Sequence, residues 1–152
     1  MISDLQSLLY KAENEYLATA ELNIFKSQAF SLEKRLKIYE LLRDRESEVF
    51  QYVADALVRK FPEDDKSKID RALQYWISIL RYCSMAMLGE NHLYLEYRIL
   101  EWLPEQIEVY ELQDISKTIF SLLSKRLPKI MNSEEFSVLQ PFWEQTQKMG
   151  NG

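Results

Sequence analysis

The sequence predicts an all-α protein, and three observations support this prediction. Only 3 Gly and 4 Pro occur among 152 residues, so few positions interrupt a helix. Apolar residues recur at every third or fourth position along most of the chain, which is the period of an amphipathic helix. One short segment, residues 93–97, alternates as a strand does, but no second strand exists to pair with it.

The first 19 residues predict a short helical extension of a single domain over residues 1–152. A chain of this length can bury roughly 70% of the surface that its unfolded form exposes, so its core needs no disulfide or metal. A break and a new start are expected at residues 19–21. The extension carries one apolar stripe, which must be buried on the protein's own core or on a partner. The stripe consists of Leu5, Leu8, Leu9, Ala12 and Tyr16.

Two further helices are predicted, over residues 22–42 and 49–61, because both segments carry apolar residues at the helical period. Apolar residues vanish around residues 43–46, so one helix can end there and another begin. Pro62 ends the second helix. The acidic connector over residues 62–66 predicts a solvated turn, because it lacks the Gly and the spaced ligands of a calcium loop.

The longest helical pattern spans residues 67–88 and predicts the central helix of the fold. Ser67, with Asp70 three residues later, resembles a capping box and predicts the start of this helix. Gly89 and Asn91 predict its end. Its polar face is thin, and a helix this apolar is usually packed on several sides.

The C-terminal third predicts several shorter helices. Residues 93–103 favour a helix over a strand, and Pro104 kinks this helix or starts a new one. A further helix follows, and a last helix begins at Asn132 or Ser133 with Glu135 in its first turn. The whole chain thus predicts seven or eight helices of unequal length with short connections. This pattern favours a globin-like packing over an up-and-down bundle.

Composition excludes several classes of function. The formal net charge of −5 argues against general binding of nucleic acid, which needs a basic surface. The small cluster of Lys125, Arg126 and Lys129 is explained by a helix end, where cations complement the helix dipole. No apolar run approaches the roughly 20 residues of a membrane span, and no secretory signal begins the sequence. A single cysteine suits a reducing compartment, so we expect a cytoplasmic protein without membrane insertion.

The residues that carry chemistry argue against an enzyme. The single histidine, His92, cannot build a metal cluster, and it is better explained as a surface or capping residue than as an axial haem ligand. Cys83 has no sequence neighbour that would activate it, so a buried and inert thiol is expected. No Gly-rich phosphate loop is present. We therefore expect no catalytic residues and no metal site.

Several short motifs, in the same order along the chain, resemble the phycobiliproteins, the bilin-carrying light-harvesting proteins of cyanobacteria. Leu80-Arg81-Tyr82, followed by Met85-Ala86, resembles the LRY…YA stretch of that family's long central helix. Upstream, Glu15-Tyr16-Leu17 and Ala54-Asp55-Ala56-Leu57 resemble its EYLS start and its AARALF helix. Downstream, Arg98-Ile99-Leu100 to Gln106 resembles its RCLNGLRET segment. The resemblance covers most of the chain and implies the family's globin-like fold.

The departures from this family concern the pigment. The family tethers its bilin through the cysteine of a C-x-R-D pattern, and the corresponding positions here are Ala72, Gln74 and Tyr75. Cys83 lies eleven residues past Ala72, which is about 16 Å along a helix. The resemblance therefore implies a paralogue that lacks covalent bilin attachment, such as the bilin-biosynthesis-associated globins. Tyr75 and Trp76 are expected to fill the volume that the pigment would occupy.

The resemblance implies a role in protein–protein interaction rather than in light harvesting. The partners would be a second copy of the chain, in a homodimer, or proteins of the phycobilisome or of bilin biosynthesis. The family pairs its subunits through the N-terminal region. The expected interface residues are Leu5, Leu9, Tyr16 and Leu17.

The alternative is a carrier that holds bilin or haem without a covalent bond. In this alternative Arg81 would pair with the propionates of the pigment, and Tyr75, Trp76 and Tyr82 would stack on its rings. The full set of expected pocket residues is Ala72, Gln74, Tyr75, Trp76, Arg81 and Tyr82.

Overall fold

The computed structural model describes residues 2–150, which form seven α-helices and one short 3-10 helix and contain no strand. The all-α class and the number of helices predicted from the sequence are confirmed. Residues 1 and 151–152 of the expected domain lie outside the described part. The elements are α1 (Ile2–Ala12), α2 (Thr19–Lys60), the 3-10 helix η1 (Glu63–Asp65), α3 (Lys66–Gly89), α4 (His92–Leu100), α5 (Leu103–Val109), α6 (Gln113–Ile130) and α7 (Ser133–Gly150).

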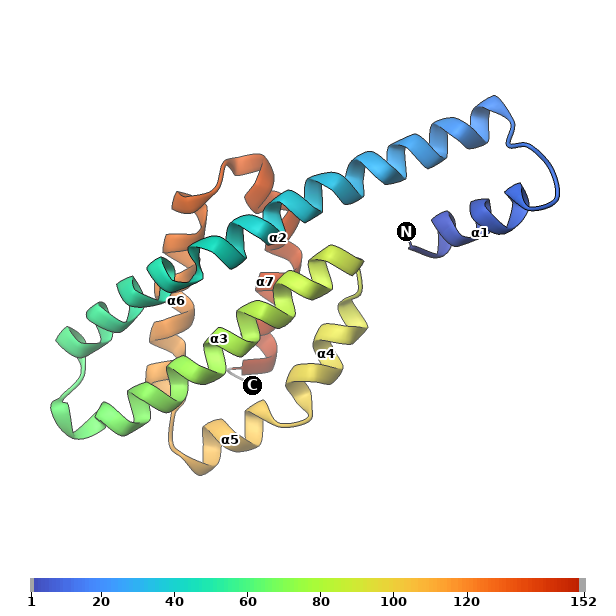
Figure 1. Cartoon of the computed structure of the whole chain (residues 1–152). Helices are drawn as coiled ribbons and strands as arrows, with labels where there is room; N and C mark the ends of the chain where they lie inside the picture. The colour runs from blue at the N-terminus through green and yellow to red at the C-terminus, as the bar shows by residue number, and fades with distance from the viewer. Residues whose placement is uncertain (1, 151–152) are drawn as a thin grey trace.

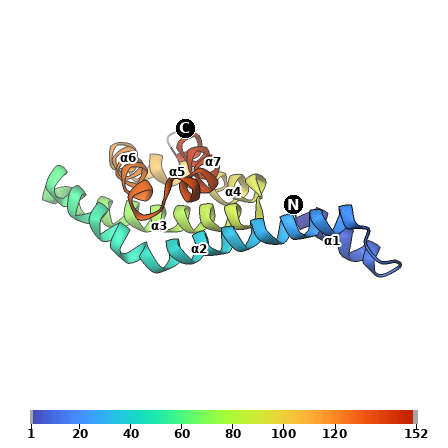
Figure 2. The ribbon, with the colours of Figure 1, turned by 90° about the horizontal axis from the view of Figure 1, so that it is seen from above.

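The body of the protein is built around α3. Figures 1 and 2 show α2 running along one side of α3, while α4 to α7 lie on its other side. The first part of α2 extends well beyond this body, and α1 folds back beside it. We call residues 2–30 the N-terminal arm. The first buried residue of α2 is Arg35, and the first buried apolar one is Ile38, so the arm lies outside the core.

One helix, α2, replaces the two helices predicted over residues 22–61, so the expected break at residues 43–46 is wrong. Leu42 and Val49 are both buried, and a spacing of seven residues returns to the same face after two turns. The gap between them therefore does not interrupt the buried stripe. The charged residues in the gap pair on the surface, with Arg45 Nε 2.6 Å from Glu48 Oε2. Such pairs support the helix at this point.

The central helix α3 agrees with the prediction along its length and differs at its ends. It begins at Lys66, so Ser67 lies inside the first turn, and the N-terminus has no side-chain cap. It ends at Gly89, and Glu90 rather than a glycine adopts the left-handed conformation, with φ 49°. The backbone N–H of Asn91 donates to the carbonyl of Ala86 at 2.8 Å and closes the helix end.

Three other helix starts agree with the sequence patterns. Asn91 caps α4, where its side chain accepts a hydrogen bond from the Tyr94 N–H at 2.9 Å, so residues 93–97 are helical as expected. Asn132 and Glu135 form a reciprocal capping box before α7, with distances of 2.7 and 2.8 Å. Pro104 lies in the first turn of α5, where its missing N–H costs nothing.

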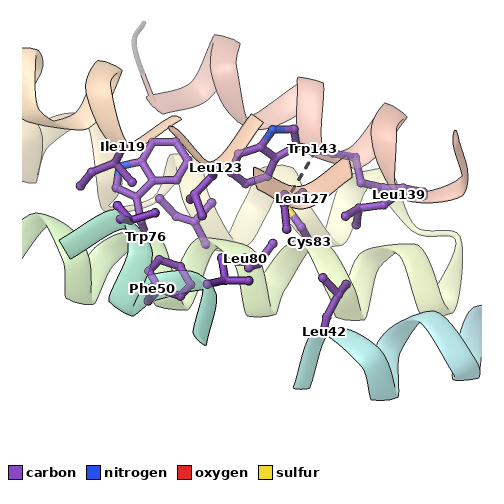
Figure 3. Close-up of a cluster of buried hydrophobic side chains, with 14 of the residues drawn as sticks. Leu42, Phe50, Trp76, Leu80, Cys83, Ile119, Leu123, Leu127, Leu139 and Trp143 are labelled. Carbon is purple, nitrogen blue, oxygen red and sulfur yellow. Dashed lines mark hydrogen bonds between the residues drawn. The ribbon is translucent and has the colours of Figure 1, made fainter. Parts of the chain in front are cut away.

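Aromatic side chains pack among Leu and Ile side chains in the core where α3 meets α6 and α7 (Figure 3). The ring of Trp76 lies 5.7 Å from that of Trp143 and 5.9 Å from that of Phe120. Each buried indole has a hydrogen-bond acceptor, because Trp76 donates to Ser116 and Trp143 donates to Ser124, both at 2.9 Å. Both buried indole N–H groups are therefore hydrogen-bonded within the apolar interior. Within residues 2–150, none of the helices is both long and apolar enough to cross a bilayer.

Candidate functional site

The expected pocket residues of α3 do not share one hollow. Ala72 and Trp76 are buried in the core. Gln74 is exposed to solvent, and Tyr75 is half-buried beneath the segment that joins α4 and α5. Because successive residues of a helix point in different directions, this short stretch of α3 contacts the core, the solvent and a neighbouring element.

Neighbouring side chains fill the space between Tyr75 and α5. The Tyr75 hydroxyl lies 3.0 Å from Gln106 Oε1, and its ring packs edge-on against Trp102 at 5.2 Å. One turn earlier on α3, the guanidinium of Arg71 lies 3.7 Å above the ring of Tyr110. A bilin held here would need this space, a nucleophile and a carboxylate for its pyrrole nitrogens. Ala72 offers a methyl group in place of the nucleophile, and Tyr75 offers a phenol, bonded to Gln106, in place of the carboxylate. These residues therefore do not fit a tethered bilin.

Arg81 and Tyr82 lie two turns further along α3, beside a hollow of about 380 Å³ between α2 and α3. The Arg81 guanidinium binds the carboxylate of Glu46 through two hydrogen bonds, at 2.7 and 2.8 Å. These bonds raise the pKa of Arg81 above its ordinary value. The cation that the sequence suggested for a propionate is therefore paired with a carboxylate of the protein itself.

Cys83 lies inside the core, as expected from the sequence. Its side chain is buried, and its Sγ atom lies 3.8 Å from the Phe142 carbonyl oxygen. Burial raises the pKa of the Cys83 thiol far above its ordinary value, because the thiolate would lose its hydration. The native protein thus offers no reactive thiol at this position.

We expect Cys83 to resist labelling by 5,5′-dithiobis(2-nitrobenzoate) in native buffer at mildly alkaline pH and to react fully in concentrated guanidinium chloride. The thiol is neutral and covered in the folded state, and it becomes an ordinary thiol in the unfolded chain. Absorbance at the wavelength of the released thionitrobenzoate measures the reaction. Rapid stoichiometric labelling of the folded protein would contradict the buried position.

His92 has the surface role that its sequence context predicts. Its Nδ1 atom lies 2.8 Å from Gln145 Oε1, and its ring stacks on Phe142 with the centroids 4.0 Å apart. These contacts fix the start of α4 against α7. Among the side chains that the structure describes, no three of His, Cys, Asp or Glu lie together in a way that could hold a metal ion.

The N-terminal arm holds the four expected interface residues. Leu9 is 57% exposed, and Tyr16 is fully exposed in the connection between α1 and α2. Leu5 and Leu17 are half-buried. The hairpin is fixed by a 2.5 Å ion pair between Lys11 and Glu21.

Further apolar side chains extend this exposed surface of the arm. Tyr10, Leu22, Ile24 and Phe30 are all exposed. The apolar pattern predicted over residues 22–42 extends past the body of the protein, because periodicity cannot distinguish a helix face that meets the core from one that does not. A concentration of exposed apolar groups on one projecting segment is typical of a protein-binding surface.

The chain is similar to a family of known proteins over most of its length. The model of a family described as phycobilisome protein matches residues 8–145 of the chain. A search of curated proteins found no match. The matched range includes most of the arm and nearly all of the helical body.

Proposed function

Because the chain belongs to the phycobilisome protein family, we propose that it is a cytoplasmic, non-enzymatic protein that acts through protein–protein interaction. The process would be phycobilisome assembly or turnover, or the regulation of bilin biosynthesis. The observation that carries this proposal is the N-terminal arm, which projects from an otherwise well-packed all-α body and exposes apolar side chains. The fold itself is the all-α, globin-like fold of the phycobiliproteins.

The proposal includes the absence of a covalent chromophore. A thioether bond to a bilin needs an accessible cysteine, and the single cysteine of the chain is buried. The positions that the resemblance assigns to attachment hold a buried Ala72 and a Tyr75 that packs on Trp102. Both observations support a helical body that carries no covalent pigment and holds the arm in place.

The alternative of a non-covalent bilin or haem carrier gains no support from the geometry. Its residues separate into the core, the contact with α5 and the hollow between α2 and α3. Its cation, Arg81, is held by Glu46. We therefore favour the role in protein–protein interaction.

We propose a homodimer in which the arm provides the interface. Leu9 and Tyr16 would supply its exposed apolar contacts, while Leu5 and Leu17 would position the hairpin. Burying apolar surface contributes about 25 cal/mol per Å², and aromatic side chains supply much of the energy of protein interfaces. The interface is thus expected to depend on Tyr16 and its apolar neighbours rather than on ion pairs.

We expect Tyr16→Asp and Leu9→Asp each to shift the protein from dimer to monomer, because a carboxylate in an apolar interface loses its hydration without a partner. Sedimentation velocity at tens of micromolar protein measures this shift. The matched control is Val58→Asp, which places the same charge on a side chain that is 70% exposed near the other end of α2.

Circular dichroism checks that all three variants keep the helical fold. A wild-type protein that sediments as a monomer, with no change in either arm variant, would remove the proposed homodimer. A control variant that dissociates as strongly as Tyr16→Asp would show that the arm is not the interface.

A further inference from the structure

A hollow between α6 and α7 has a composition that sets it apart from the acidic surface of the protein. Its volume is about 520 Å³. Two ammonium groups, two hydroxyls, one amide and one aromatic ring border it, and no carboxylate does. The residues are Lys117, Phe120, Ser121, Ser124, Lys125 and Gln147.

The two lysines of this hollow are available to a ligand. Lys117 and Lys125 are both exposed, and neither forms an ion pair with any residue in the described part of the chain. This is notable in a chain with 24 acidic and 19 basic residues, where Lys34 and Lys68 do pair with carboxylates. Lys117 and Lys125 lie eight positions apart, about two turns of one helix face, so an anion between them could be reached by both ammonium groups.

A second hollow, between α2 and α6, borders the same row of α6 residues and adds one further positive charge at this position. Its volume is about 350 Å³, and it shares Lys117, Ser121 and Lys125 with the first. It adds Lys60 from the last turn of α2 and again contains no carboxylate. Three ammonium groups therefore lie along these two adjoining hollows, where they attract anions.

The floor of the first hollow is fixed by the aromatic core. The Ser124 hydroxyl oxygen accepts the indole N–H of Trp143 at 2.9 Å, which holds the oxygen in place and leaves its own O–H able to donate. The ring of Phe120 stacks on Trp143, with the centroids 5.0 Å apart and an interplanar angle of 8°. Figure 3 shows Trp143 in this part of the core. A fixed hydroxyl beside an aromatic floor provides one polar and one apolar contact for a ligand.

We propose that the hollow between α6 and α7 binds a small organic anion. The phosphate or carboxylate group of this anion would lie between Lys117 and Lys125 and accept a hydrogen bond from the Ser124 hydroxyl. The apolar part of the anion would lie on the ring of Phe120. The volume is within the range of small-molecule sites. This site is independent of the arm and of the proposed dimer.

Titration with phenyl phosphate and, separately, with benzoate tests the proposal by ¹⁵N-resolved NMR of the full chain. The indole N–H signal of Trp143 is the reporter, because its acceptor is Ser124. The indole N–H of Trp102 donates to the Arg98 carbonyl, neither residue lines the hollow, and this signal serves as an internal control. We expect a saturable shift of the Trp143 signal with at least one probe, and the tighter probe identifies the preferred head group.

Replacing single lysines distinguishes binding at this hollow from a general attraction of anions to positive charge. Lys117→Gln and Lys125→Gln are each expected to weaken binding about tenfold, the effect of one lost charged hydrogen bond. The control Lys37→Gln removes the same charge from the exposed face of α2 and should leave the affinity unchanged. The proposal is overturned if neither probe shifts the Trp143 signal at millimolar concentration, or if all three variants weaken binding equally.

Discussion

Replacement of Trp76 by alanine is expected to lower the free energy of unfolding by about 3–5 kcal/mol. The indole is 1% exposed and packs against both Phe120 and Trp143. Its removal leaves a cavity where three helices meet and takes the hydrogen-bond donor away from the buried Ser116. Both losses act in the same direction, because lost packing and an unsatisfied buried hydroxyl each destabilise the folded state.

Urea denaturation followed by far-ultraviolet circular dichroism measures this loss. Trp76→Phe keeps most of the volume but removes the indole N–H and part of the ring system, so a smaller loss of about 1–2 kcal/mol is expected. Val58→Ala removes an apolar side chain that is 70% exposed and should change stability by less than about 0.5 kcal/mol. A loss for Trp76→Ala no larger than that for Val58→Ala would mean that the indole is not part of the core.

Arg35→Met is expected to cost about 2–4 kcal/mol, because it leaves the backbone carbonyls in the last turn of α3 without their buried donor. Arg35 is 2% exposed. Its guanidinium donates to the carbonyl of Met87 at 3.4 Å and to the carbonyl of Leu88, and its Nε atom lies 3.6 Å from a Glu90 carboxylate oxygen. Burial lowers the pKa of Arg35, against the opposing effect of Glu90, yet the group remains protonated in the physiological range.

Two controls assign this loss to its cause. Glu90→Gln removes the ion pair alone, and since Glu90 is partly exposed the expected cost is below about 1 kcal/mol. Lys34→Met removes a neighbouring cation that pairs with Glu134 on the surface, and a similarly small change is expected. Hydrogen exchange should show faster opening of the last turn of α3 in Arg35→Met only. Equal losses in Arg35→Met and Glu90→Gln would mean that the ion pair, and not the backbone carbonyls, is the source of the stability.

The parts of the fold that the sequence predicted are those that depend on local patterns. The body of α3 follows from apolar spacing, and the box of Asn132 and Glu135 follows from two residues three positions apart. The continuity of α2 was missed because the charged segment was judged without the seven-residue spacing of Leu42 and Val49. The left-handed Glu90 was missed for a different reason. Gly89, which precedes it, is the residue that normally adopts this conformation. The contact of Glu90 with Arg35 joins segments that are far apart in the sequence, so no local pattern indicates it.

The candidate sites depend on contacts between distant segments, so the sequence predicted them less well. Tyr75 carries no local sign that Trp102 and Gln106 cover it. The hollow between α6 and α7 was not predicted either. Lys125 was grouped with the helix end, whereas its partner in the hollow, Lys117, lies two turns earlier, and Gln147 comes from another helix. Periodicity identifies the face of a helix that is buried, but it does not identify what lies opposite that face.

The unbroken length of α2 makes the arm and the body one mechanical unit. Its 42 residues contain neither Gly nor Pro, and they span about 63 Å at 1.5 Å per residue. A helix without such residues has no preferred point of bending, so a tilt of α2 within the body is transmitted to the arm as in a lever. With about 24 Å of helix between Arg35 and Thr19, a tilt of about 5° displaces the tip by roughly 2 Å. A partner held by the arm would therefore respond to a rearrangement of the body that it does not touch.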